Sequence, residues 1–198
     1  MKASRKELII ASATKRFAHF GFSKTTMHEI AEDLHITKAN LYYYYPDKLS
    51  LMKDVILSIS EKVHLHEKEI IEEGGSVLAI ISKILSHRRE MNIKYCMLQL
   101  SENLEMIKGL ELEEVIQVIN ARDESSIEQI LSTGIAVGEL QNIDVKDVAR
   151  TLLDVISGLN FLCNIADIFK GLPNPNNDSL ILEKQMKATV LIYNGIKN

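Results

Sequence analysis

Two short helices separated by a tight turn are predicted by residues 21–52, which read GFSKTTMHEIAEDLHITKANLYYYYPDKLSLM. Thr26, followed three residues later by Glu29, is typical of a capped helix start, and Thr37 can cap a second helix that runs to about Tyr45. This second helix carries four of the six tyrosines in the chain. A soluble protein seldom lines up so many rings on one short helix without a surface for them to contact, and base and phosphate contacts fit best. The stretch therefore predicts a helix-turn-helix that binds DNA.

Helical periodicity continues on both sides of this stretch. A first helix is expected over about 4–19, with Ser4 as its cap, and its predicted buried face consists of Leu8, Ile9, Ala13, Phe17 and Ala18. A long helix is expected over about 48–73, and Gly74-Gly75 ends it. Further helices are expected at roughly 76–89, 91–107, 110–133, 145–169 and 179–196. Because no segment alternates in the manner of a strand, the sequence predicts an all-α fold of about nine helices.

The charge is distributed unevenly along the chain. Residues 1–50 hold eight Lys or Arg against five acids, a balance of +3, so the remainder must carry −7 to reach the net −4. We expect an N-terminal helix-turn-helix domain over 1–48 and a larger helical domain over 49–198, with 49–73 as the connecting helix. The imbalance is modest and also fits ordinary scatter of charges.

The chain shows no sign of secretion or of a membrane span. Cys96 and Cys163 are isolated in apolar helical settings, which favours buried free thiols in a reducing compartment. The amphipathic start MKASRKELIIASATKRF lacks the apolar run of a signal peptide. No window approaches eighteen apolar residues. We therefore expect a cytoplasmic protein with no membrane partner.

The N-terminal region resembles the TetR family of transcriptional regulators. The resemblance is carried by Gly21-Phe22, Thr25-Thr26, Ile30-Ala31, Thr37-Lys38, Leu41-Tyr42, Tyr45 and Lys48 at the family's spacing. It covers residues 4–55 strongly and is architectural beyond them. The family usually has a glycine in the turn where this chain has His35, and a left-handed backbone would cost another residue about 1 kcal/mol. Either the turn accepts the histidine or its geometry differs slightly.

The resemblance also implies which side chains meet DNA. Lys38 and Tyr42 would approach base edges, with Tyr42 able to touch a thymine methyl group. The phosphate-binding set would comprise Thr26, Asn40, Tyr43 and Lys48, and Asn40 could also read an adenine edge. His28 occupies a position that often reaches the groove, although an exposed histidine without a role fits equally well. Thr37 and Tyr44 complete the predicted DNA-binding set, whereas Leu41 and Tyr45 should pack in the core.

The C-terminal helices predict a homodimer. The helix at 145–169 is apolar nearly all round, so it must bury two sides. One side can face its own core, and the other, together with Leu180, Ile181, Val190 and Leu191, would meet the same surface of a second copy. Leu152 and Leu191 are expected at this contact. The alternative is a helix buried at the centre of a monomer.

The middle helices would hold a small effector if the resemblance extends to them. The candidate lining residues are Met91, Tyr95, Gln99, Asn103, Met106, Phe161 and Asn164, where polar groups interrupt apolar faces. This composition favours a hydrophobic or amphipathic organic molecule, although each of these residues also fits an ordinary core. No cofactor, metal or catalytic constellation is expected, and His64, His66 and Glu67 are expected on a solvated face.

The sequence thus predicts a ligand-responsive repressor that binds a palindromic double-stranded DNA operator as a homodimer. The alternative is a regulator of the same fold that has no small-molecule effector and uses its C-terminal domain only for dimerisation or protein partners. A helical scaffold without a DNA role is the third class of function.

Overall fold

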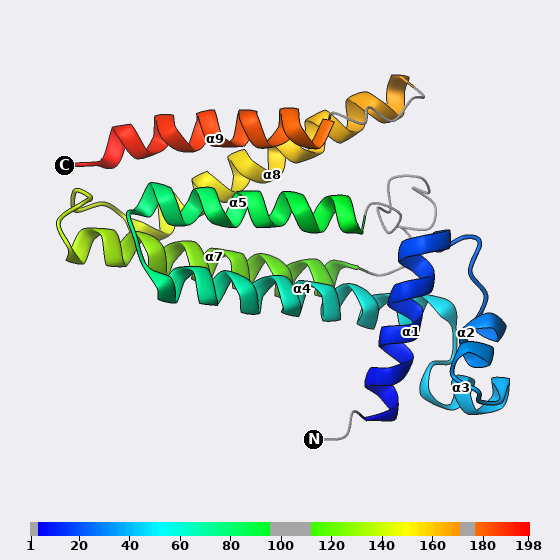
Figure 1. The fold of residues 1–198 in the computed structure, drawn as a ribbon. Coiled ribbons are helices and arrows are strands. Elements are labelled where there is room, and N and C mark those ends of the chain that lie inside the picture. Colours follow the sequence, from blue (N-terminus) through cyan, green and yellow to red (C-terminus); the bar gives the residue numbers. More distant parts are fainter. Residues whose placement is uncertain (1–3, 96–111, 171–176) are drawn as a thin grey trace. The chain divides into compact units, whose positions relative to one another are not determined.

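The computed structural model describes residues 4–95, 112–170 and 177–198, with only the backbone for 164–170. Within these residues it contains eight α-helices and no named strand (Figure 1). The helices are α1 (Arg5–Phe20), α2 (Met27–Asp33), α3 (Lys38–Tyr44), α4 (Lys48–Glu73), α5 (Val77–Lys94), α7 (Glu113–Ala136), α8 (Val145–Lys170) and α9 (Asn177–Ile196). The all-α prediction is confirmed. Among these helices none is long and apolar enough to cross a membrane.

Packing divides the chain into two compact units. The first comprises Met1–Lys62 and Lys94–Gln117, and the second comprises Val63–Ile93 and Val118–Asn198. Helix α4 begins in the first unit and ends in the second. The first unit therefore contains the helix-turn-helix together with the first half of α4.

Residues 4–62 of the first unit, which we call the head, have helices defined by capping side chains. The hydroxyl of Ser4 accepts from the backbone N–H of Glu7 at 3.2 Å, and the Glu7 carboxylate accepts from the N–H of Ser4 at 2.7 Å. Thr26 and Glu29 form the same reciprocal box at the start of α2. Gly21 ends α1 with φ 82°, a left-handed value that suits a residue without a Cβ. These predicted caps are confirmed.

The core of the head is built from α1, α2, α3 and the start of α4. Its fully buried side chains include Ile9, Phe17, Ile30, Leu41 and Leu51. The prediction that Leu41 and Tyr45 face this core is confirmed, since both are buried. Leu8 is exposed, so its predicted burial is wrong. Adjacent positions lie about 100° apart around a helix, and the buried stripe of α1 passes through Ile9 instead.

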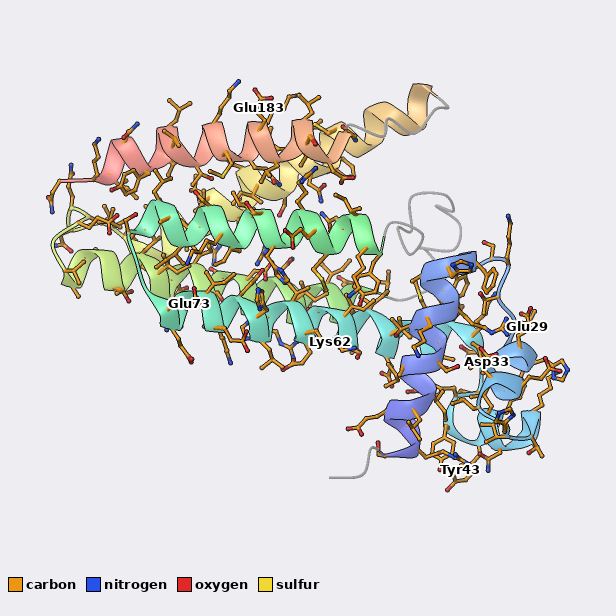
Figure 2. All side chains as sticks on the ribbon, viewed as in Figure 1. Glu29, Asp33, Tyr43, Lys62, Glu73 and Glu183 are labelled. Atoms are coloured by element: carbon orange, nitrogen blue, oxygen red, sulfur yellow. The ribbon has the colours of Figure 1, made fainter. Side chains whose placement is uncertain are left out.

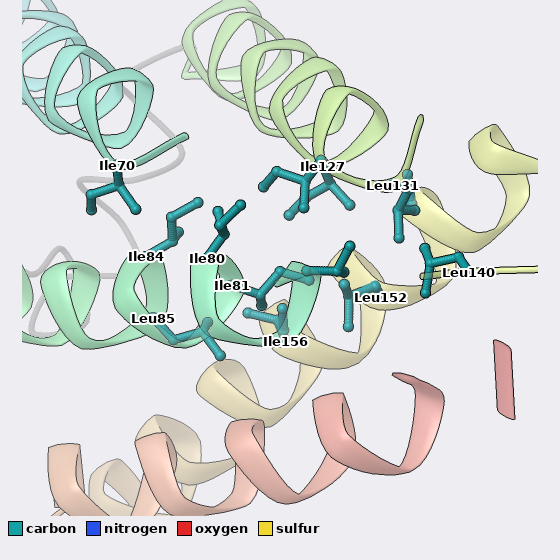
Figure 3. Packing of buried hydrophobic residues seen from close by; sticks show 13 residues of the cluster. Ile70, Ile80, Ile81, Ile84, Leu85, Ile127, Leu131, Leu140, Leu152 and Ile156 are labelled. Carbon is teal, nitrogen blue, oxygen red and sulfur yellow. The ribbon is translucent and has the colours of Figure 1, made fainter. Parts of the chain in front are cut away.

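The core of the second unit lies where α5 faces α7 and α8 (Figure 3). Ile80, Ile81 and Ile84 of α5 pack with apolar residues from elsewhere in this unit, among them Ile70, Ile127, Leu131, Leu140, Leu152 and Ile156. Leu152 is buried in this core within one chain, at 2% exposure. Its predicted place at a contact with a second copy is therefore wrong, because the side chain is already covered by its own protomer.

Two predicted helix boundaries are corrected by the structure. Helix α5 continues to Lys94, so no break separates 76–89 from a helix starting at 91, and no Gly or Pro stands there to cause one. Helix α7 continues past Gly134 to Ala136, and Gly138 instead takes the positive φ of 75°. At Gly134 a Cβ would lie 2.5 Å from Cγ2 of Val77, so this glycine permits close packing with the start of α5. The rest of the helix predicted at 91–107 lies outside the described residues.

A cluster of charged side chains joins three helices of the second unit. Arg88 of α5 donates two hydrogen bonds to Glu67 of α4, at 2.6 and 2.9 Å, and two to Asp123 of α7, at 2.9 and 2.8 Å. Glu67 is only 1% exposed. The prediction that His64, His66 and Glu67 share a solvated face is therefore wrong for Glu67. Next to this cluster the rings of His66 and His87 contact each other, with centroids 4.2 Å apart.

Candidate nucleic-acid interface

Helices α2 and α3 pack against each other across the turn that joins them. Leu34 follows α2, and His35 takes φ 51°, the one positive value found at a non-glycine residue in the described chain. The N–H groups of His35 and Ile36 donate to the carbonyls of Glu32 and Ala31, each at 3.0 Å. The turn thus accepts a left-handed histidine, which confirms the first of the two expected alternatives.

The polar residues at the start of α2 are held by hydrogen bonds. The hydroxyl of Thr26 donates to the Glu29 carboxylate at 2.8 Å and accepts from the Glu29 N–H at 3.3 Å. The hydrogen bonds that the hydroxyl and the backbone N–H of Thr26 donate to the Glu29 carboxylate lower the pKa of Glu29. At the other end of α2, Arg16 of α1 donates two hydrogen bonds to the Asp33 carboxylate, at 2.5 and 2.8 Å. Figure 2 shows Glu29 and Asp33 on this helix. The first and last turns of α2 are therefore both fixed.

Helix α3 presents tyrosine rings on its exposed side. Tyr43 is 83% exposed and points outward from the head (Figure 2), and Tyr42 and Tyr44 are also exposed. The Tyr43 and Tyr44 rings meet edge to face with centroids 5.3 Å apart, and the Lys38 ammonium lies 5.6 Å from the centre of the Tyr42 ring. These contacts restrict the rings before anything binds. A pre-ordered aromatic and cationic surface suits contact with a groove edge and its phosphates.

The remaining predicted residues divide into exposed and engaged groups. Thr37 accepts the N–H of Asn40 at 3.2 Å and so caps α3, which leaves the Asn40 side chain at the exposed helix start. His28 is exposed on α2, with Nε2 3.2 Å from the Glu32 carboxylate. Lys48 differs, because its ammonium donates to the carbonyls of Phe22 and Thr25 at 2.9 and 2.8 Å. One N–H of Lys48 is left for any further partner.

One group of residues in the head was not found from the sequence. The hydroxyl of Tyr45, the residue that ends α3, donates to Oδ2 of Asp54 on α4 at 2.7 Å. The same oxygen lies 2.8 Å from Nζ of Lys6 on α1. Burial, reinforced by the bond to Asp54, raises the pKa of Tyr45. Lys6, Tyr45 and Asp54 are far apart in sequence, so only the packed helices bring them together.

The predicted effector residues are only partly described. Met91 and Tyr95 are half-buried. Gln99, Asn103 and Met106 lie outside the described residues, as does the side chain of Asn164. Phe161, predicted as a wall, is 63% exposed, whereas the wall of an enclosed cavity would be largely buried. The described residues therefore give the predicted pocket no enclosed wall at Phe161.

Comparison with known proteins agrees with the helix-turn-helix geometry. Residues 9–55 match the family described as bacterial regulatory proteins, tetR family. The chain is 27% identical over 165 residues to the HTH-type transcriptional regulator YhgD of Bacillus subtilis, covering 81% of this chain and 85% of that protein. It is 29% identical over 110 residues to the HTH-type transcriptional regulator RutR of Escherichia coli, covering 56% and 51%.

The fold is shared with solved structures. A transcriptional regulator from Cytophaga hutchinsonii superposes with a TM-score of 0.84 at 24% identity, covering 97% of this chain and 98% of that one. At this identity the superposition establishes the common fold. The family match covers residues 9–55, and the superposition extends the shared fold over nearly the whole chain.

Proposed function

Because the chain belongs to the TetR family of helix-turn-helix transcriptional regulators, we propose that it is a ligand-responsive repressor that binds a palindromic operator as a homodimer. It is a DNA-binding regulator and not an enzyme. The observation that carries the proposal is the exposed aromatic and cationic surface of α3, held at its start by Thr37 and at its end by Tyr45.

In this proposal α3 enters the major groove. Lys38 and Tyr42 contact base edges, while Asn40 and Tyr43 contact phosphates. Thr26, His28, Thr37 and Tyr44 complete the DNA-facing surface. All eight residues are exposed, which supports this assignment. Lys48 is not part of this DNA-facing set, because its ammonium is already engaged.

The DNA-binding role can be tested without knowing the operator. Double-stranded DNA enriched from a random-sequence library by the wild-type protein provides the specific probe, and a scrambled duplex of the same composition provides the non-specific one. Tyr42→Ala should weaken binding to the enriched duplex by about 1–3 kcal/mol. Phe20→Ala is the matched control, since Phe20 is an exposed aromatic residue on α1. A failure of enrichment, or equal losses in both variants, would count against the proposal.

A second copy is proposed to cover the outward faces of α8 and α9, which pack together in one chain (Figure 1). Exposed apolar side chains on these two helices are Phe161, Leu162, Leu180 and Leu191. An open depression on α9 is lined by Met186, Val190 and Leu191, together with Glu183 and Lys187. Figure 2 shows Glu183 on the outward side of this helix. A single head binds DNA too weakly for specificity, so two copies on two half-sites are expected.

Dimerisation is tested by one substitution and a matched control. Leu191→Glu places a charge on the proposed contact, where burial without a partner costs several kcal/mol. We expect a folded monomer by sedimentation velocity and circular dichroism. Val137→Glu alters a residue that is equally exposed, at 70% against 73% for Leu191, but lies in the turn after α7, so this variant should remain dimeric. A monomeric wild-type protein at micromolar concentration would remove the basis for this part.

The effector is proposed to be a small hydrophobic or amphipathic molecule bound by the C-terminal helices, with Met91 and Tyr95 among its contacts. Thermal-shift screening with metabolite mixtures, followed by DNA titration with each compound that raises Tm, tests this. A compound that stabilises the protein and lowers operator affinity supports a repressor released by its ligand. If no compound does both, the alternative without a small-molecule effector is favoured.

A further inference from the structure

Helix α4 contacts both ends of the helix-turn-helix through polar side chains. Lys48, its first residue, bonds the carbonyls of Phe22 and Thr25, just before the cap of α2. Asp54, six residues later, bonds the hydroxyl of Tyr45, which ends α3. At 1.5 Å per residue these two contacts are about 9 Å apart along one helix. One rigid element therefore fixes where the DNA-binding pair begins and where it ends.

The contact at the entry to α2 is partly buried. The Lys48 ammonium lies 4.2 Å from the centre of the Phe22 ring, and Phe22 is buried. Thr25 is also buried and donates its hydroxyl to the Gly21 carbonyl at 2.9 Å. Desolvation lowers the pKa of Lys48. The ammonium is thus engaged by two carbonyls of the loop between α1 and α2.

The contact at the exit from α3 joins three helices through one oxygen. Oδ2 of Asp54 accepts both the Tyr45 hydroxyl and the Lys6 ammonium, which also lies 5.6 Å from the centre of the Tyr45 ring. Tyr45 is buried, and a buried hydroxyl needs a partner. A charged acceptor gives that bond more strength than a neutral one would. Asp54 therefore orients the last residue of the tyrosine-bearing helix.

We propose that Lys48 and Asp54 are positioning residues, which set sequence-specific DNA binding by fixing α2 and α3 to α4 without contacting the DNA. This rests on the DNA-binding role proposed above. Specific recognition needs side chains placed to within a fraction of an ångström, whereas non-specific attraction depends on charge alone. Loss of a positioning residue should therefore lower the ratio of operator to scrambled-duplex affinity.

The effect of charge separates this role from a phosphate contact. A lysine that neutralises a phosphate contributes about 0.9 to the slope of log affinity against log salt. As a positioning residue, Lys48 changed to Met should weaken binding to the enriched duplex about tenfold and leave this slope unchanged. Lys38→Met is the matched control on the exposed surface: Lys38 is proposed at a base edge but also brings a positive charge to the duplex, so its slope should fall by up to about one unit per half-site. A fall of that size for Lys48→Met overturns the proposal for Lys48.

For Asp54, a pure charge effect and a positioning role predict opposite changes in affinity for the enriched duplex. Removing a carboxylate from a DNA-binding domain strengthens binding if only charge matters. As a positioning residue, Asp54 changed to Asn should weaken binding to the enriched duplex about tenfold, with scrambled-duplex affinity equal or higher. Unchanged or stronger binding to the enriched duplex overturns the proposal. A merely destabilised head would instead lose affinity for both duplexes in the same proportion, which also overturns it.

A double-mutant cycle tests the bond itself. Tyr45→Phe removes only the hydroxyl and should lower the affinity ratio like Asp54→Asn, and the double variant should be no worse than either single one. If Asp54→Asn does not fold, Tyr45→Phe alone decides, since it keeps the buried ring. Fully additive losses overturn the proposed link. A wild-type protein that binds neither duplex would instead refute the DNA-binding role, so the two failures are distinguishable.

Discussion

Each unit of the molecule contains an arginine that joins helices through two carboxylates, and the two clusters differ in burial. In the head, Arg16 joins α1 to Asp33 and Glu29 of α2. In the second unit, Arg88 joins α5 to Glu67 of α4 and Asp123 of α7. The two arginine side chains are about equally exposed, at 21% and 23%, but Asp33 is 41% exposed and Glu67 only 1%. The carboxylates, not the arginines, make one cluster superficial and the other buried.

Because of this difference in burial, the pKa values of the two aspartates shift in opposite directions. The hydrogen bond from Arg16 lowers the pKa of Asp33. Burial raises the pKa of Asp123, although Arg88 donates two hydrogen bonds to its carboxylate. The charge of Glu67 also raises this pKa. Burial acts to lower the pKa of Arg88, but the hydrogen bonds that Arg88 donates to Glu67 and the charges of Glu67 and Asp123 raise it overall. The same pair of residue types is therefore favourable at the surface and costly in the interior.

The largest effect is expected for Arg88→Met. The substitution leaves Glu67 and Asp123 facing each other without a cation, and breaking a buried pair in this way costs about 3–5 kcal/mol. Urea unfolding followed by circular dichroism at one fixed protein concentration measures the loss. Arg150→Met is the control, since Arg150 is an exposed arginine paired with Glu124 on the same unit. A loss as small as that of the control would show that burial does not distinguish the clusters.

Replacing the whole buried cluster should cost much less than removing its arginine. The variant Glu67→Leu, Arg88→Met and Asp123→Leu removes all three charges together with their desolvation penalty. We expect its free energy of unfolding to lie within about 1 kcal/mol of the wild type, or above it. The same urea experiment decides. If the triple variant is less stable than Arg88→Met, the charges themselves stabilise the fold and the comparison fails.

The sequence predicted most of the head and little of the second unit, and these clusters show why. The caps of α1, α2 and α3 join residues three apart, such as Ser4 with Glu7 and Thr26 with Glu29. Local spacing is visible in a sequence, and the TetR resemblance added the residues that are proposed to face DNA. Arg16 and Asp33 are 17 residues apart, and Arg88 and Asp123 are 35 apart. Such contacts depend on which helices pack together, which no local pattern reveals.

The incorrect predictions also arise because local sequence patterns do not show which helices pack together. Glu67 lies in a charged run of α4, EKVHLHEKE, which is typical of a solvated face. Only the neighbouring α5, with Arg88, makes that face an interior one. Leu152 was placed at a contact between copies because α8 is apolar nearly all round, and periodicity cannot tell which apolar side faces its own core. The helix predicted at 110–133 stops before Gly134, although this glycine lies within α7 and permits the close approach of Val77.

The pH dependence of stability should have opposite signs in the two clusters. The folded pKa of Asp33 lies below its usual 3.8, so its contribution is present above that value and is lost as the pH falls through the lowered one. The folded pKa of Asp123 lies above 3.8, so its contribution is present below that value and is lost as the pH rises through the raised one.

Melting temperatures of the wild type, Asp123→Asn and Asp33→Asn across the acid range measure the pH-dependent contributions of the two aspartates. Relative to Asp123→Asn, the wild type should lose stability as the pH rises from about 4 toward neutrality. Relative to Asp33→Asn, it should keep a constant advantage above about pH 5 and lose that advantage only in stronger acid. If both differences change in the same direction with pH, burial does not set the pKa of Asp123.

The smallest effect is expected for Arg16→Met. Its partners Asp33 and Glu29 are well exposed, so water and salt already screen the interaction, and the stability of the head should change little. Salt provides the sharper test. In about 1 M salt the Debye length falls to about 3 Å, so any difference between Arg16→Met and the wild type should disappear. The loss caused by Arg88→Met should persist at that salt concentration, because Glu67 is out of reach of the ions. Urea titrations of the three proteins at low and high salt give both results, and a defect of Arg88→Met that also vanished in salt would mean that the second cluster is as open to solvent as the first.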